Sequence, residues 1–229
     1  MRFSAPLVPG RLVRRYKRFL ADCRLDGGEE VTAHVANSGS MLGLATPGAR
    51  VFLSRSNDPK RKLAWSWELV EVDGALVGIN TGLPNRIVAE AIADGRIPAL
   101  AGYDRLRREV AYGVRSRVDL LLEGEGRPAC YVEVKSVTLS RRAGLAEFPD
   151  AVTMRGAKHL GELAAMVGAG ARAVLVYLVQ RGDCAAFEIA ADIDPVYAAA
   201  ARAAVLAGVE TLVAHADVTT GGIEIRTVF

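Results

Sequence analysis

The run of residues from Ala173 to Val179, Ala-Val-Leu-Val-Tyr-Leu-Val, is apolar at every position. A strand with one solvated face alternates apolar and polar residues, so an uninterrupted run of this length is typical of a strand covered on both faces. Apolar spacing predicts a helix before it, from about Val152 to Val167. An alanine-rich helix after it is capped by Asp194-Pro195 and ended by Gly208. We therefore predict a layered α/β domain with this strand at its centre.

The segments that precede this strand follow a defined order. Pro84 opens a predicted amphipathic helix that Gly95 ends. Three strands are predicted next, and together with the later helix and the apolar strand they give the order α-β-β-β-α-β. Two further strands are expected near the C-terminus. The expected strands are Arg107–Tyr112, Arg117–Leu122, Cys130–Val137, Val209–Val213 and Ile223–Val228.

Residues 1–82 are β-rich and suit a small closed barrel of the OB kind. Asp26-Gly27-Gly28-Glu29 is a hairpin turn signal, and several short strands follow it. The segment from Leu12 to Leu20 is ambiguous, because its apolar residues have helical spacing, although a bulged first strand gives the same pattern. We favour a strand because the hairpin follows at once. The expected domains are thus a barrel over 1–82 and an α/β domain over 83–229.

The net charge of +3 is unevenly distributed along the chain. Residues 1–82 hold 12 Lys/Arg and 8 Asp/Glu, a difference of +4, whereas residues 83–229 hold 17 and 18, a difference of −1. A basic first half favours a polyanion as partner. No window approaches the roughly 20 apolar residues of a membrane span, so no membrane contact is expected. Three scattered cysteines, Cys23, Cys130 and Cys184, are typical of reduced, buried thiols in a cytoplasmic protein.

Two carboxylates and a lysine stand in the apolar strands predicted at 117–122 and 130–137. Glu133 and Lys135 share a face by strand alternation, and the hairpin brings Asp119 near them. Two acidic side chains that hold Mg²⁺ (or Mn²⁺), with a lysine beside the attacking water, form a phosphodiester-hydrolysing site. Glu90, on the first helix, is the candidate that completes it. The alternative is a surface hairpin with an ordinary Glu–Lys pair. The order of elements instead matches the PD-(D/E)XK nuclease superfamily, although Val118 replaces the proline of its motif.

Basic residues supply the predicted DNA contacts, which are to phosphate and independent of base sequence. One face of the helix predicted at 152–167 is expected to meet phosphate beside the metal site. Trp65 and Trp67 are interpreted either as base-stacking residues or as barrel core, and His34 and His215 as non-catalytic. The candidate DNA-binding residues are Arg14, Arg15, Lys17, Arg18, Lys60, Arg61, Lys62, Arg155, Lys158 and His159.

Several strings together resemble the bacterial and archaeal sugar fermentation stimulation protein A family. They include Asn37-Ser-Gly-Ser-Met41, Leu83-Pro-Asn-Arg86, Ser116-Arg-Val-Asp119, Glu133-Val-Lys-Ser-Val-Thr-Leu139 and Phe148-Pro-Asp-Ala-Val-Thr153. The resemblance covers essentially the whole chain. It implies an OB-like barrel joined to a PD-(D/E)XK nuclease-like domain, non-specific DNA binding and a regulatory role in sugar metabolism.

Three functions remain open at this point. The first is a DNA-binding protein with a Mg²⁺-dependent nuclease centre, acting on duplex, single-stranded or structured DNA. The second is a non-enzymatic DNA-binding regulator of sugar (maltose) metabolism with a vestigial nuclease site. The third is a barrel that binds a small anion. A homodimer is compatible with the sequence, which does not decide the oligomeric state.

Overall fold

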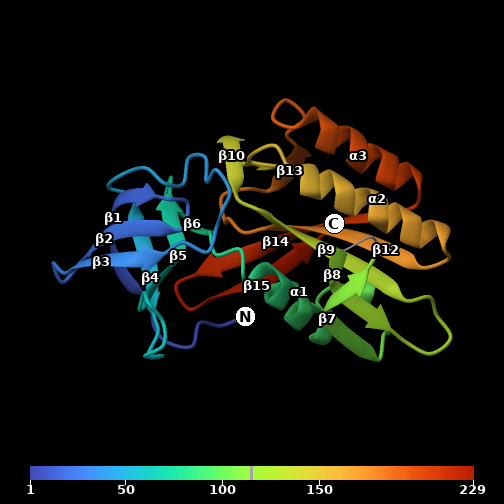
Figure 1. Ribbon diagram of the computed structural model, residues 1–229, viewed down its shortest axis with the longest axis horizontal. Helices are drawn as coiled ribbons and strands as arrows, with labels where there is room; N and C mark the ends of the chain where they lie inside the picture. The colour runs from blue at the N-terminus through green and yellow to red at the C-terminus, as the bar shows by residue number, and fades with distance from the viewer. Residues whose placement is uncertain (114–115) are drawn as a thin grey trace.

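The computed structural model describes residues 1–113 and 116–229 and consists of two β-rich bodies packed side by side (Figure 1). The N-terminal body is a six-stranded sheet in the order β3-β2-β1-β4-β5-β6, which an additional β3–β5 pairing closes into a five-stranded barrel. This arrangement confirms the predicted OB-like barrel. Its strands are β1 (Val8–Tyr16), β2 (Leu20–Leu25), β3 (Glu30–His34), β4 (Arg50–Arg55), β5 (Trp65–Val72) and β6 (Ala75–Gly78).

The ambiguous first segment is a strand, as predicted, and its helical spacing has a local cause. The register of β1 against β2 shifts between Leu12 and Arg14, which is a bulge that displaces the alternation of side chains by one residue. Leu12 packs into the barrel core together with Trp67, which is fully buried. The core interpretation therefore holds for Trp67, whereas Trp65 is half-buried beneath the Arg55 guanidinium.

The second body is built on a six-stranded sheet in the order β15-β14-β12-β9-β8-β7. One helix covers one face of this sheet, and two helices cover the other (Figure 1). The element order confirms the predicted α-β-β-β-α-β arrangement. The sheet strands are β7 (Arg105–Tyr112), β8 (Ser116–Glu123), β9 (Cys130–Val137), β12 (Arg172–Val179), β14 (Glu210–Thr219) and β15 (Gly222–Val228), and the helices are α1 (Pro84–Ala93), α2 (Met154–Gly168) and α3 (Pro195–Leu206).

Strand β12 lies at the centre of this body and contains the apolar run from Ala173 to Val179. It pairs in parallel with β9 on one side and β14 on the other, and every residue of the run is buried. Val174 and Val176 pack toward α1, whereas Leu175 and Tyr177 pack toward α2 and α3. Burial on both faces explains why this strand shows no polar alternation.

A second, smaller sheet was not predicted from the sequence. It joins β10 (Leu139–Arg142), β11 (Leu145–Phe148) and β13 (Ala186–Ile189), and a short 3₁₀ helix, η1 (Pro98–Leu100), was also missed. Strand β11 leads directly into the segment 148–153, which precedes α2. This small sheet thereby fixes the start of the segment 148–153, which lines the cleft described below.

The barrel is attached to the second body through backbone and side-chain contacts. The Gly78 amide donates to the carbonyl of Gln180 at 2.9 Å, and a β-carbon at Gly78 would lie 2.9 Å from the Ile223 side chain. A larger residue at Gly78 would therefore press against the end of the Ile223 side chain. Leu69 of β5 also belongs to the core beneath α1. The two bodies therefore share packed surface and hold one another in place.

The three cysteines are buried and unbridged within the described ranges. Of the helices that the structure describes, none combines the length and the apolar character needed to cross a bilayer.

Candidate nuclease-type site

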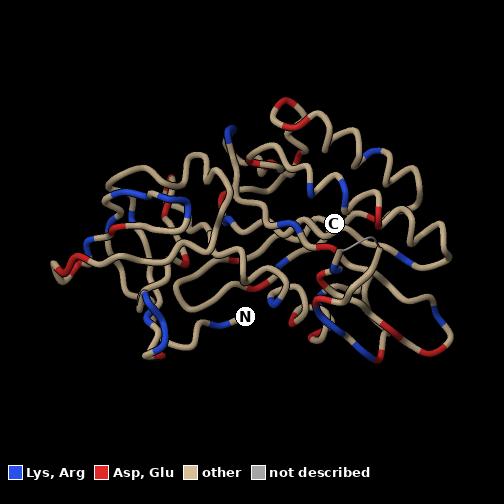
Figure 2. The backbone as a smooth tube through the Cα atoms, in the orientation of Figure 1, with Lys and Arg blue, Asp and Glu red and all other residues tan. Residues whose placement is uncertain are grey.

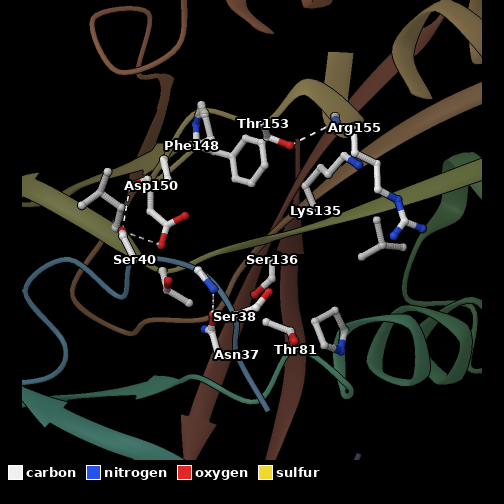
Figure 3. A pocket seen from close by; sticks show the side chains of 18 of the residues that line it. Asn37, Ser38, Ser40, Thr81, Lys135, Ser136, Phe148, Asp150, Thr153 and Arg155 are labelled. Carbon is white, nitrogen blue, oxygen red and sulfur yellow. Dashed lines mark hydrogen bonds between the residues drawn. The ribbon is translucent and has the colours of Figure 1, made fainter. Parts of the chain in front are cut away.

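A cleft of about 880 Å³ lies between the barrel and the second body. The barrel side of the cleft includes Arg15, Arg18 and residues 37–40, and the opposite side includes residues 133–136, 147–153 and 155–156 (Figure 3). Asp119, Glu133 and Lys135, the three residues of the predicted acidic site, all line this cleft. The structure therefore brings the three together and exposes them to the same space.

Asp119 lies where the β8–β9 ladder ends. The last paired residues are Leu120 and Val132, and beyond them the Asp119 carboxylate accepts the Val134 amide hydrogen at 2.7 Å. Its other oxygen accepts from the Asn85 side chain at 2.8 Å. The two-residue alternation of β8 breaks here, because Val118 packs on the α2 side together with Leu121, whereas Leu120 packs on the α1 side. Both oxygens of Asp119 are thus oriented by fixed donors.

Glu133 is almost fully buried on the side of β9 that faces α2, at 3% exposure. One carboxylate oxygen, Oε1, contacts two groups: Lys135 Nζ at 2.6 Å and His159 Nδ1 at 2.5 Å. The other oxygen, Oε2, is buried and has no hydrogen-bond partner within residues 1–113 and 116–229. Buried polar atoms in proteins are nearly always paired, so this oxygen is able to accept a ligand.

The two carboxyl groups have pKa values shifted in opposite directions. Burial and the nearby Glu133 charge raise the pKa of Asp119 to about 6. The hydrogen bonds from Val134 and Asn85 act in the opposite direction but are outweighed. Burial also acts to raise the pKa of Glu133, but the bond to His159 and the Lys135 ammonium outweigh it and lower that pKa. Glu133 is therefore ionised near neutral pH, and Asp119 exchanges its proton close to the physiological range.

This donor set is small. The part of the chain that the structure describes contains no group of three or more His, Cys, Asp or Glu arranged to hold a metal ion. Two carboxylates with one unpaired oxygen suit a hard cation that takes its remaining ligands from water and phosphate.

The structure does not bring Glu90 into this set. Glu90 pairs with the Met1 amino group at 2.9 Å and with Arg86 at 2.7 Å, and these partners lower its pKa. Asn85 of the same helix is the residue that reaches Asp119. Glu90 is five positions after Asn85, which places the two about 140° apart around the helix, so both cannot face the site.

The basic residues of the barrel have different environments. Arg14 pairs with Asp22 at 2.8 Å, and Arg15 donates to the carbonyls of Arg18, Asn37, Gly39 and Ser40. Arg15 therefore supports the barrel loop and does not present a free guanidinium. Arg18 lines the cleft, and Lys17 precedes it in the same turn.

The other basic segment of the barrel lies elsewhere. Lys60, Arg61 and Lys62 are in the loop between β4 and β5, at the lower edge of the barrel in Figure 2 and away from β9 and β10. The two basic segments therefore lie on different parts of the barrel, with Arg18 at the cleft and residues 60–62 in the β4–β5 loop.

The three candidate residues on α2 do not share one role. Arg155 lines the cleft, and its Nε donates to His159 Nε2 at 3.3 Å. His159 is only 5% exposed and contacts Glu133, so it belongs to the acidic site and not to a phosphate-binding surface. Lys158 contacts Ser116 at 3.2 Å and Glu162 at 3.5 Å. His34 lies in β3, and buried His215 contacts the Cys184 carbonyl.

Sequence reasoning did not assign site roles to several residues of the cleft. Asn85 orients Asp119, and Asp150 joins the barrel loop to the second body through Ser40. Thr153 caps α2 by accepting the Gly156 amide hydrogen at 3.0 Å. The sequence signal for these residues is that they lie in the strings 37–41, 83–86 and 148–153, which carry the family resemblance. The strings alone do not show which side chains meet at the cleft.

Comparison with known proteins agrees with the architecture. The family description "SfsA N-terminal OB domain" matches residues 13–79, and "Sugar fermentation stimulation protein RE domain" matches residues 82–222. A sugar fermentation stimulation protein homolog of Rhodospirillum centenum is 65% identical over 98% of this chain and 97% of its own length. A homolog from Paramagnetospirillum magneticum is 62% identical over 98% and 95%, respectively.

A solved structure has the same fold. Pyrococcus furiosus SfsA in complex with Ca²⁺ matches with a TM-score of 0.90 at 28% identity, covering 100% of this chain and 96% of that chain. The matches extend over both the OB-like barrel and the restriction-endonuclease-like domain. The chain therefore belongs to the sugar fermentation stimulation protein family.

Proposed function

We propose that this protein is a divalent-metal-dependent phosphodiesterase of the nuclease type, acting on DNA held in the cleft. The observation that carries the proposal is the unpaired, buried Oε2 of Glu133 on the strand next to Asp119. An ionised carboxylate oxygen without a partner costs free energy in a buried site, and a cation removes that cost. The Ca²⁺ complex of the Pyrococcus furiosus relative supports a hard cation, and Mg²⁺ or Mn²⁺ is the proposed physiological ion.

Asp119 and Glu133 would hold the cation, which when bound supplies Lewis acidity toward the phosphate and lowers the pKa of a water. Asn85 and the Val134 amide orient Asp119, while His159 and Lys135 orient Glu133. The Lys135 ammonium also offsets charge that develops on the phosphoryl oxygens. Hydrolysis adds the water oxygen to phosphorus, breaks the bond to the leaving strand and passes the proton to the leaving oxygen.

The proposed DNA contacts are to phosphate and independent of base sequence. Arg18 on the barrel side and Arg155 on α2 place guanidinium groups at the cleft, and such groups bind phosphate oxygens of any sequence. The three unbridged thiols agree with a reducing, cytoplasmic setting. The guanidinium groups at the cleft support DNA as the partner.

The test incubates the purified protein with Mg²⁺ or Mn²⁺ and with duplex, single-stranded and branched DNA and with RNA. We expect cleavage of at least one DNA form by the wild type and none by the Asp119→Ala variant. Lys62→Ala, a change in the β4–β5 loop, serves as the control that keeps cleavage. Calorimetry of cation binding to the same proteins reads out the site independently of turnover. A wild-type protein that binds the cation and cleaves none of these substrates would contradict the enzymatic proposal.

A second candidate is a DNA-binding regulator of sugar metabolism whose nuclease site is vestigial. The displacement of Glu90 from the site favours it, because an acid on the first helix was expected to complete the metal ligands. This reading predicts DNA binding that needs no metal and survives Asp119→Ala. Footprinting of chromosomal DNA would then show preferred sites.

A further inference from the structure

The cleft is closed at one end by a contact between the two bodies. Ser40 Oγ donates to the Asp150 carbonyl at 2.8 Å and to its carboxylate at 3.0 Å, and the Met41 amide donates to the same carboxylate at 3.1 Å. Both Ser40 and Asp150 line the cleft. In Figure 3 this pair lies on the opposite side of the cleft from Lys135 and Arg155.

The loop that makes this closure is held in place by several hydrogen bonds. The Arg15 guanidinium donates to the carbonyls of Asn37 at 2.9 Å, Gly39 at 3.0 Å and Ser40 at 3.3 Å. The Asn37 side chain donates to the Ile79 carbonyl and accepts from the Gly39 amide. A β-carbon at Gly39 would lie 3.0 Å from the carboxylate of Asp150, so a side chain there would press against the contact. The closure is thus a built feature of the barrel.

The acidic site lies toward the other side of the cleft. Lys135 marks its position, because its ammonium is 2.6 Å from the Glu133 carboxylate. The volume of about 880 Å³ is within the range of roughly 300–1,000 Å³ that is typical of small-ligand pockets. A space of this size holds a few nucleotides of one strand, whereas a duplex with its two backbones is much larger.

Positive charge is available on both sides of this short space. Within the described part of the chain the Arg18 side chain makes no hydrogen bond or ion pair, and the Arg155 side chain makes one hydrogen bond, from Nε to His159. Hydroxyl groups of Ser38, Ser136 and Thr153 also line the cleft. Guanidinium and hydroxyl groups are the donors that bind a sugar–phosphate backbone without reading its bases.

We propose that the cleft receives the free end of a single DNA strand. The strand enters beside Arg155, passes the carboxylates and stops at the contact between Ser40 and Asp150. A strand without an end cannot be accommodated in this way, because it would have to continue through the closed side. This inference rests on the proposed function, which identifies the ligand as DNA. It adds that the protein binds the end of a strand.

The test measures binding of the full-length protein in Ca²⁺, with a fluorescent linear single-stranded oligonucleotide as the probe. Unlabelled linear DNA competes against the same sequence closed into a circle, so that composition and charge are matched. We expect the linear strand to compete at least roughly tenfold better than the circle. Equal competition by the circle overturns the inference, whether or not the protein cleaves DNA.

A double variant, Ser40→Ala with Asp150→Ala, tests the cause of the preference. Removal of both side chains opens the closed side, so affinity for the circle should rise toward that for the linear strand. Ser140→Ala, which removes the hydroxyl of a half-buried residue on β10 that does not line the cleft, is the matched control and should keep the preference. Thermal melting and circular dichroism establish that each variant is folded. A folded double variant that still rejects circles contradicts the assignment of the stop to Ser40 and Asp150.

The outcomes separate this inference from the proposed function. Preferential binding of linear strands without cleavage in Mg²⁺ or Mn²⁺ supports the inference and removes the nuclease proposal. Cleavage of circles and linear strands at equal rates supports the nuclease proposal and overturns the inference. Failure to bind any DNA at low salt overturns both.

Discussion

His159 Nδ1 lies 2.5 Å from Glu133 Oε1, whereas the other oxygen of the same carboxylate has no partner among the described residues. Arg155 Nε donates to His159 Nε2 at 3.3 Å, so in the neutral ring the proton is on Nδ1 and is donated to Glu133. The histidine thereby orients Glu133 through Oε1, so that Oε2 stays available to a cation. It is a positioning residue that acts through the carboxylate.

Replacement of His159 by alanine should weaken divalent cation binding by about 10–100-fold, as is usual when the partner that orients a metal ligand is lost. His159→Asn should retain much of the affinity, because the amide nitrogen can replace Nδ1 as donor. Calorimetric titration with Ca²⁺ or Mn²⁺ measures the effect. His34→Ala, in β3, is the control. Unchanged cation affinity in His159→Ala would show that the contact has no positioning role.

The raised pKa of Asp119 should make the metal-free protein less stable as the pH rises. The folded protein holds this proton up to a pH of about 6, whereas the unfolded chain releases it near 3.8, so stability falls between these values and stays low above them. Asp119→Asn cannot ionise, so above about pH 7 it should be more stable than the wild type by on the order of 2 kcal/mol.

Melting temperatures of the two metal-free proteins measure this difference. An increase of roughly 4–8 °C in Asp119→Asn is expected near neutral pH, and it should shrink toward pH 4. The comparison at low pH is the internal control, because both side chains are then uncharged. A variant that melts below the wild type at every pH would mean that the hydrogen bonds of Asp119 outweigh its burial.

Cation binding should depend on pH through the same group. Because the cation replaces the proton on Asp119, affinity should be nearly constant above a pH of about 6 and fall about tenfold per unit below it. Glu133 contributes no dependence in this window, since its pKa is lowered. Titrations with Ca²⁺ at several pH values give the profile. A flat profile down to pH 5 would exclude Asp119 as a ligand.

Much of this architecture was predictable because it depends on local periodicity. The unbroken apolar run of β12 is typical of a strand buried on both faces, and the two-residue period of β9 placed Glu133 and Lys135 together. The strand β1 was also predictable from local sequence. Its spacing alone fits either a helix or a bulged strand, and the hairpin signal that follows it favoured the strand.

Other features depend on contacts between distant segments, which periodicity does not report. Asn85 reaches Asp119 and Glu90 does not, because the rotation of α1 is set by the packing of Ile87 and Val88. His159 appeared to share an outer face with Arg155, but α2 rests on the sheet through the neighbouring Leu160 and buries it. Ser40 of the barrel loop contacts Asp150, which follows β11. These residues are 110 positions apart, and no pattern in the sequence indicates that they meet.

The separation of the two basic segments of the barrel predicts which one binds DNA. Arg18 lines the cleft, whereas Lys62 lies in the distant β4–β5 loop. Each phosphate contact contributes about 0.9 to the slope of log affinity against log salt concentration for a duplex and about 0.7 for a single strand. Arg18→Ala should therefore reduce the slope by nearly one contact and weaken binding of all sequences alike, while Lys62→Ala should leave it unchanged. Fluorescence anisotropy over a range of NaCl concentrations measures both slopes. If Lys62→Ala lowers the slope as much as Arg18→Ala does, DNA lies across the barrel and not in the cleft.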